Sequence, residues 1–179
     1  NIAESVTVVK GASAVQYGTG AIGGVILVEP GALPYGDSIN GRVNLGGMSN
    51  GMGFNGGGVL QGGIGNKPAW AWRVQGSYTQ RGDSRAPDYF LTNTGARTLN
   101  YSAALGFQKN RISLDLFYSR FDQTLAILRS AHIGNLTDLE NAIASGEPII
   151  ADDFSYWIDR PKQEVDHQLI KMRGSWDIP

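Results

Sequence analysis

Three glycines near the start of the chain have the spacing that most directly suggests chemistry. Gly18, Gly20 and Gly23 match the pattern G-x-G-x-x-G, in which backbone amides at a helix start bind the pyrophosphate of a dinucleotide. In this sequence the glycines lead into "VILV" at residues 25–28, a β-branched run, and Pro30-Gly31 follow before a helix could form. The sequence therefore predicts a strand after the glycines and no nucleotide site.

Two histidines and two carboxylate pairs are the other groups that could do chemistry. His132 and His167 are far apart in the sequence and the chain has no cysteine, so no metal-ligand set is indicated. Asp152-Asp153, and Glu164 with Asp166, have the spacing of an acid/base pair, but neighbouring carboxylates in a polar loop are usually exposed charge. We therefore predict no metal site, no cofactor and no catalytic residue, and we do not expect an enzyme.

Composition restricts the class of partner more than the class of fold. The chain has 179 residues and a net charge of -1, which gives no basic footprint for a nucleic acid. No apolar run approaches the ~20 residues of a spanning helix, but a membrane β-strand needs only about 9–11 residues of alternating character. Glycine is abundant at 25 residues, without a collagen period. Because the chain starts without Met and stops directly after a strand-like run, we expect both ends to be cuts through something larger.

Alternation with period two predicts six antiparallel strands, each with an apolar and a polar side. The clearest lies at residues 70–81, where Trp70, Trp72 and Val74 alternate with Arg73 and Gln75. The remaining predicted strands are at residues 99–108, 112–119 and 169–178, with two glycine-rich strands at about 39–48 and 54–65. This pattern predicts an all-β fold.

The predicted connections alternate between short and long. Residues 65–69 and 109–111 are short turns, whereas residues 83–98 and 128–166 are long loops. Outer-membrane barrels have this asymmetry between their two ends. Within the second long loop, Thr137 and Glu140 have capping-box spacing before a short helix that Gly146 ends.

Aromatic residues fall near both ends of the predicted strands, as expected for two membrane girdles around an apolar band. From Trp72 to Tyr78 a tilted strand covers roughly 15 Å, and from Trp70 about 20 Å. The girdle residues would be Trp70, Trp72, Phe107 and Trp176 at one end and Tyr78, Tyr101 and Tyr118 at the other. An antiparallel sheet of a soluble protein, with one wet and one dry face, is the alternative. Six strands cannot enclose a lumen lined by Arg and Gln, so a membrane barrel requires further strands outside this chain.

The segment "ESVTVVKGASAVQYGTGAIGGVILVEP", at residues 4–30, resembles the C-terminal end of the plug domain of TonB-dependent outer-membrane receptors. The residues that match the family pattern are Glu4, Val8, Val9, Lys10, Gly11, Ser13, Tyr17, Gly18, Gly20, Ala21, Ile22, Gly23, Gly24, Val25 and Ile26. Ala12 and Leu27 depart from it, since the family usually has Pro and often Asn there. Residues 126–169 look like a subset of these receptors common in Bacteroidetes.

The resemblance implies a fragment of a plugged transmembrane antiparallel β-barrel of about 22 strands when complete. Residues 1–30 would end the plug, 31–38 would be a linker and 39–179 would hold the first six barrel strands. In this family TonB, engaged through an N-terminal segment absent here, drives uptake of a ferric siderophore, haem, cobalamin or glycan across the bacterial outer membrane. The expected partners are TonB, that ligand and outer-membrane lipid. A non-transport barrel or adhesin, and a soluble β-rich binding module, are the alternative functions.

Three sets of site residues follow. The structural plug residues would be Lys10, Gly11, Ser13, Tyr17, Gly18, Gly20, Gly23 and Gly24, whose glycines would turn the chain with positive φ and pass close to the barrel wall. The possible ligand contacts in the long loops are Arg81, Tyr89, Phe90, Tyr156 and Trp157, which could equally pack the loops together. Lumen-facing cations are expected at Arg42, Arg73, Arg81, Lys171 and Arg173, with bonds to the plug favoured over attraction of an anionic ligand.

Overall fold

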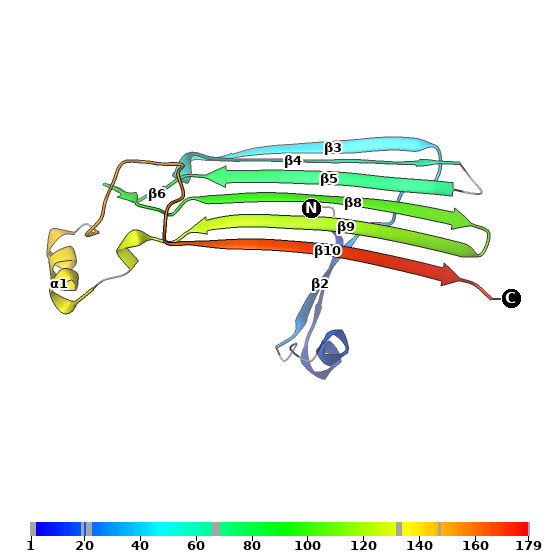
Figure 1. Cartoon of the computed structure of the whole chain (residues 1–179), viewed down its shortest axis with the longest axis horizontal. Helices are drawn as coiled ribbons and strands as arrows, with labels where there is room; N and C mark the ends of the chain where they lie inside the picture. Colours follow the sequence, from blue (N-terminus) through cyan, green and yellow to red (C-terminus); the bar gives the residue numbers. More distant parts are fainter. Residues whose placement is uncertain are drawn as a thin grey trace.

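Antiparallel strands make up most of the structure. The computed structural model describes residues 3–18, 20, 23–65, 69–131, 134–146 and 148–178. Its main element is an open six-stranded sheet in the order β10-β9-β8-β5-β4-β3, accompanied by the small sheets β1-β2 and β6-β7 (Figure 1). The strands are β1 Ala3–Val9, β2 Val25–Pro30, β3 Ser38–Met48, β4 Gly53–Ile64, β5 Ala69–Arg81, β6 Ser84–Arg85, β7 Phe90–Leu91, β8 Ala96–Lys109, β9 Ile112–Ala126 and β10 Lys162–Trp176. The predicted all-β class is confirmed; in the described residues the large sheet ends in two edges, β3 and β10, and does not close.

All six strands predicted from the alternation are present, but β8, β9 and β10 are several residues longer than predicted. β9 continues to Ala126 and β10 already begins at Lys162, so the two pair along fifteen residues. The second long loop is therefore residues 127–161, not 128–166. β8 begins at Ala96, and β6 and β7 lie in the first loop, which becomes residues 82–95 in place of 83–98. Ser38 belongs to β3, so the linker ends at Asp37.

Short helices occupy the connections. The 3-10 helices are η1 Gly11–Tyr17, η2 Asn50–Met52 and η3 Arg129–Ala131, and the α-helix is α1 Leu136–Ser145. α1 was predicted, but its cap was not: Asn135 is the N-cap, and its side chain accepts a hydrogen bond from Asp138 N. Thr137 lies inside the helix, so the predicted capping box is wrong. Gly146 ends α1, as predicted, and the structure gives it a left-handed backbone.

The strand register gives the six-stranded sheet two chemically different faces. Paired residues share a face, so the pairing Val43–Gly58–Gly76–Tyr101–Arg120 fixes one side for every strand. We call this side the apolar face because it carries large hydrophobic residues that are between 40% and 84% exposed: Ile39, Val43, Leu45, Phe54, Leu60, Ile64, Trp70, Val74, Leu99, Tyr101, Leu105, Ile112, Leu114, Leu116, Ile170, Met172 and Trp176. On the opposite, polar face, the exposed large hydrophobics of the described strands are Met48 and Leu169.

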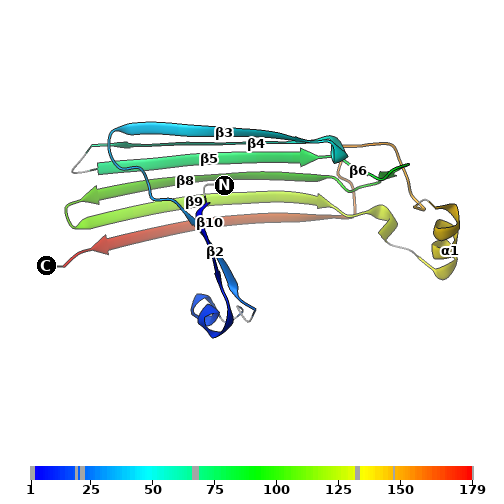
Figure 2. The same ribbon diagram turned by 180° about the vertical axis from the view of Figure 1, so that it is seen from behind.

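The β1-β2 hairpin stands apart from the sheet on the side of the polar face. In Figure 2 the linker from β2 crosses in front of the sheet before it enters β3, and the hairpin with η1 projects away from the strands. Val6, Val8 and Ile26 of the hairpin are all more than half exposed. No helix in the described part of the chain has the length and apolar character needed to span a membrane.

Candidate ligand-binding loops

Three connections meet at one end of the sheet and are bonded to one another, and we call them the loop platform (residues 49–52, 82–95 and 127–161). Backbone hydrogen bonds join them: Gly82 N donates to Gly51 O at 2.8 Å and Asp83 N donates to Ser155 O at 3.0 Å. Arg129 N donates to Thr92 O at 3.3 Å. The loops are thus fixed to one another in addition to being anchored by their strands (Figure 1).

Two buried polar residues hold this platform together. Asn93 is 3% exposed; its Nδ2 donates to Ile127 O at 2.8 Å and to Pro161 O at 2.9 Å, and its Oδ1 accepts from Asp159 N at 2.9 Å. Asp83 is 2% exposed and its Oδ1 accepts from Thr94 N at 2.8 Å. The Asn93 contacts join the first loop to residues far along the sequence, whereas the Asp83 contact lies within the first loop, and a local sequence pattern does not predict the former.

Aromatic rings form a second link within the platform. Phe154 lies between Phe90 at 5.6 Å and Tyr156 at 4.9 Å, and the Arg85 guanidinium lies 5.7 Å from the Phe90 ring centre. The Tyr156 hydroxyl donates to Met52 O at 2.6 Å. The rings therefore pack residues of all three connections together.

The predicted ligand contacts are only partly gathered here. Phe90 and Tyr156 meet through Phe154, a residue that the sequence analysis missed. Arg81 ends β5 and donates from Nη1 to Ser84 Oγ at 3.3 Å. Tyr89 is half-buried and its carbonyl accepts from Ala86 N. Trp157 differs from the rest because 79% of its surface is exposed.

Several carboxylates whose sequence spacing suggested acid/base chemistry form ion pairs in the structure. Arg129 pairs with Asp159 at 2.5 Å and with Asp152 at 3.6 Å. Lys162 pairs with Glu164 at 2.9 Å, and Arg120 with Asp166 at 2.6 Å. Among the residues the structure describes, no group of three or more His, Asp or Glu side chains is placed to hold a metal ion. His167 lies on the polar face of β10, and His132 is outside the described residues.

The glycine-rich segment forms a turn between two strands of the hairpin. β2 starts at Val25, which confirms the predicted strand, and Gly18 and Gly24 have positive φ angles of 141° and 132°. A side chain at Gly24 would lie 2.8 Å from Val9 O of β1. At Gly18, Gly20 and Gly23 an added Cβ would meet nothing within 4 Å among the described residues, so the close approach of these glycines to a barrel wall stays a prediction.

The other plug-motif residues lie at the start and end of η1. Lys10 precedes the helix, Gly11 has a φ of 71°, and the Ser13 hydroxyl donates to Lys10 O at 3.1 Å. Tyr17 is half exposed at the end of the helix, whereas Ala14 is fully buried. Ala21 and Ile22 of the motif are outside the described residues.

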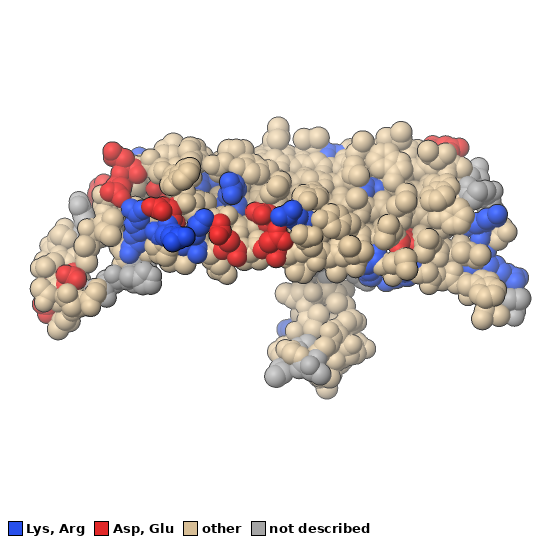
Figure 3. All heavy atoms as spheres, in the orientation of Figure 1, with Lys and Arg blue, Asp and Glu red and all other residues tan. Residues whose placement is uncertain are grey.

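All the predicted girdle residues lie on the apolar face. Their rings pair across strands: Trp70 with Phe107 at 4.7 Å, Tyr101 with Tyr118 at 6.1 Å, and Tyr78 with Phe54 at 5.8 Å. Trp72 and Trp176 share this face by register. Charged residues gather on the same face beyond the tyrosines, toward the loop platform, while the surface over the middle of the strands is mostly uncharged (Figure 3). These charged residues are Arg97, Arg120, Asp122, Lys162, Glu164 and Asp166.

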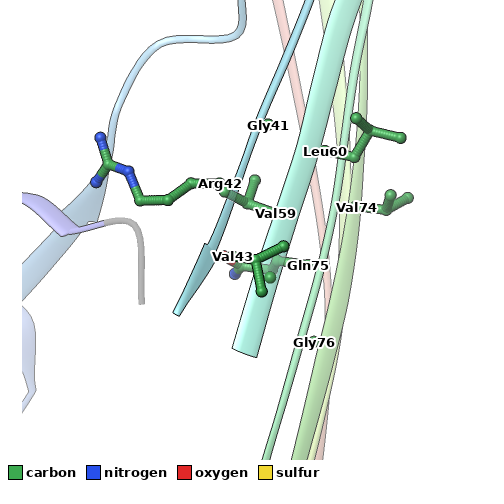
Figure 4. A pocket seen from close by; sticks show the side chains of 9 residues that line it. Gly41, Arg42, Val43, Val59, Leu60, Val74, Gln75 and Gly76 are labelled. Carbon is green, nitrogen blue, oxygen red and sulfur yellow. The ribbon is translucent and has the colours of Figure 1, made fainter. Parts of the chain in front are cut away.

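The predicted lumen cations share the polar face. Figure 4 shows Arg42 extending toward the side of the hairpin, while Leu60 and Val74 extend to the other side of the sheet. Arg73 is 6% exposed and donates from Nη1 to Gly31 O at 2.8 Å and from Nη2 to Ala32 O at 2.9 Å. Its guanidinium thus bonds to two carbonyls of the linker, whereas the sequence analysis expected bonds to the plug.

Comparison with known proteins adds no relative. No protein-family model matches this sequence, and no significant similarity to a curated protein or to a solved structure was found.

Proposed function

We propose that this chain is part of a TonB-dependent transporter of the bacterial outer membrane. The β1-β2 hairpin would be the end of the plug, and β3, β4, β5, β8, β9 and β10 would be the first six strands of the barrel. The observation that carries the proposal is the apolar face, a continuous hydrophobic surface across six strands. Monomeric soluble proteins rarely expose contiguous apolar patches larger than a few hundred Å².

The distribution of residue types along the strands supports contact with lipid. The aromatic pairs Trp70–Phe107 and Tyr101–Tyr118 stand on either side of Val74, Leu105 and Leu116. Interfacial aromatics that flank an apolar band are typical of strands that cross an outer membrane. The charged cluster beyond Tyr118 would then lie among lipid headgroups and water.

The polar face supports a lumen that contains protein. It carries Arg42, Gln61, Gln75 and Ser102, and the linker already bonds to it through Arg73. A hairpin attached to this face would be enclosed once further strands extended the sheet from β3 and β10. The order of the elements agrees with the family that residues 4–30 resemble.

Function in this proposal is active transport without covalent chemistry. A ferric siderophore, haem, cobalamin or glycan would bind from outside at the loop platform, and TonB would supply the energy that rearranges the plug. Trp157 is the best placed of the predicted ligand contacts because its ring is exposed. Phe90 and Tyr156 are engaged in packing, so they would act by fixing the loops.

Growth of the source organism tests the proposal. The gene is deleted, and growth is measured with iron, haem, cobalamin or a glycan as the limiting nutrient. We expect slow growth on one of these sources and the same defect when TonB alone is removed. Unchanged growth on all four sources, or uptake that persists without TonB, would contradict transport.

A further inference from the structure

Residues 31–37, between β2 and β3, lie flat on the polar face of the sheet and are held there at several points. Arg73 bonds to two successive carbonyls, Gly31 O and Ala32 O, and its Nε donates to Gln61 Oε1 at 2.6 Å. Asp37 Oδ1 accepts from Gly65 N at 2.7 Å at the other end of the segment. Both ends are thus bonded to the sheet through charged side chains, which form stronger hydrogen bonds than neutral ones.

The middle of this segment packs onto small residues. A Cβ at Gly63 would overlap Pro34 O, and one at Gly106 would lie 2.7 Å from Leu33 Cδ1 and overlap the Tyr35 hydroxyl. Ala71, on the same face between them, is fully buried. The absence of larger side chains at these positions is what lets the segment approach the strands.

Tyr35 adds a polar contact in this packed region. Its hydroxyl donates to Asp115 Oδ1 at 3.3 Å, which links the segment to β9 in addition to β4 and β5. Burial, with the nearby Asp115 carboxylate as a second cause, raises the pKa of Tyr35 to about 12. The segment therefore contacts several strands within seven residues.

The β1-β2 hairpin, which precedes residues 31–37, is more exposed than that segment. Val6, Val8, Val15, Tyr17 and Ile26 are each at least half exposed, and the hairpin extends away from the sheet in both ribbon views (Figures 1 and 2). The change from an exposed to a clamped chain therefore lies between Ile26, which is exposed, and Gly31, whose carbonyl accepts from Arg73.

We propose that residues 31–37 are a fixed strap, clamped to the sheet by Arg73, and that the hairpin moves about a hinge at Pro30-Gly31 while the strap stays in place. The inference rests on the proposed function in treating the hairpin as the plug segment that rearranges. It goes beyond that function by naming the part of the connection that does not move. The strap would keep the plug attached to the strands of the barrel while the plug rearranges.

Distances between spin labels in the whole protein, in detergent micelles, test the strap. This chain has no cysteine, so Gln16→Cys in the hairpin or Ala32→Cys in the strap can each be paired with Arg111→Cys in the β8–β9 turn. All three positions are exposed. Urea loosens the weakest parts first, and neither ligand nor TonB is needed.

We expect the hairpin distance to broaden at a urea concentration where the strap distance is still narrow. In Arg73→Gln this separation should be lost, and both distances should broaden together. Lys171→Gln, which removes a cation of the same face away from the strap, should behave as wild type. If Arg73→Gln does not fold, Tyr35→Phe decides, and its strap distance should broaden at lower urea than in wild type.

Two results would overturn the strap. One is that both distances broaden at the same urea concentration in the wild type. The other is that the strap distance is unchanged in Arg73→Gln or, where that variant does not fold, in Tyr35→Phe. These outcomes are independent of transport. A strap that behaves as expected in a protein whose deletion leaves growth unchanged would overturn only the transport function. Normal TonB-dependent growth with a strap that loosens together with the hairpin would overturn only the strap.

Discussion

Asn93 joins the first long loop to the second with three side-chain hydrogen bonds. It accepts or donates three hydrogen bonds to backbone groups of residues 127–161 and has a left-handed backbone with φ of 61°. Asparagine tolerates this backbone better than most residues, because its short side chain can bond locally. Side-chain chemistry and backbone conformation therefore both select asparagine here.

Asn93→Ala should detach the long loop from the first loop. The variant loses three buried hydrogen bonds, at about 1 kcal/mol each, and adds roughly 1 kcal/mol of backbone strain. Limited proteolysis should cut residues 127–161 faster by at least tenfold. Asn93→Gly relieves the strain but not the lost bonds, so it should be cut at an intermediate rate. Asn44→Ala, in the exposed strand β3, is the control, and equal cutting of Asn93→Ala and this control would contradict the role of Asn93.

Tyr35 gives the strap a pH dependence. Its pKa is raised from 10.0 to about 12, so the protonated hydroxyl is favoured in the folded protein. The stabilising contribution is fully present below pH 10 and is lost as the pH rises toward 12. In a near-ultraviolet titration, Tyr35 should ionise only near the top of this range.

Tyr35→Phe should remove that late step and leave the remaining titration curve unchanged. Asp115→Asn should lower the pKa of Tyr35 only in part, because burial is the larger cause and Asp115 the second. A late step that persists in Tyr35→Phe would show that another tyrosine produces it.

At the scale of elements, the alternation of residue types predicted the strands where one side is apolar and failed where both sides are polar. Residues 70–81 and 99–108 were assigned nearly in full. At residues 120–126 and 162–168 the apolar side ends, and charged residues such as Arg120 and Asp166 take its place. Strand pairing continues there through backbone hydrogen bonds and ion pairs, which the alternation of apolar and polar residues does not predict.

The loop platform was beyond the reach of the sequence for a different physical reason. Phe90 and Tyr156 were predicted to contact a ligand or to pack the loops together, and the packing that the structure shows depends on Phe154 and on contacts between distant segments. Arg73 was correctly assigned to the polar face, because alternation fixes the face of a strand residue. Its buried charge requires partners, and the structure provides them in the linker, whereas the prediction named the plug.

The α1 helix provides a test of capping within a loop. Asn135 accepts from Asp138 N, whereas Thr137, the cap predicted from sequence, lies inside the helix. Asn135→Ala should destabilise α1 by about 1 kcal/mol, because an amide at the helix start loses its partner. Hydrogen exchange of the α1 amides should be about fivefold faster. Thr137→Ala is the matched control and should leave the exchange rate of the α1 amides nearly unchanged. Faster exchange in Thr137→Ala than in Asn135→Ala would support the predicted capping box instead.

At the scale of the whole molecule, the two faces of the sheet have different expected surroundings. In the described part of the chain β3 and β10 are the edges of the sheet, and the apolar face is exposed across the strands from one edge to the other. Lipid would be a suitable environment for the apolar face, and protein or water would be a suitable environment for the polar face. A soluble β-rich module would instead have to cover the apolar face with protein.

Lysine substitutions at two adjacent residues of β5 distinguish these surroundings. Val74 lies on the apolar face midway between Trp70 and Tyr78, and Gln75 lies on the polar face, where its Oε1 has no hydrogen-bond partner in the described part of the chain. In a membrane strand Val74→Lys should cost about 2–4 kcal/mol near the midplane, whereas Gln75→Lys should be tolerated. The folded fraction of the whole protein after refolding into lipid vesicles measures both. Equal folding of the two variants, or a wild-type protein that is monomeric and folded without detergent or lipid, would contradict the membrane assignment, because then the apolar face would not meet lipid.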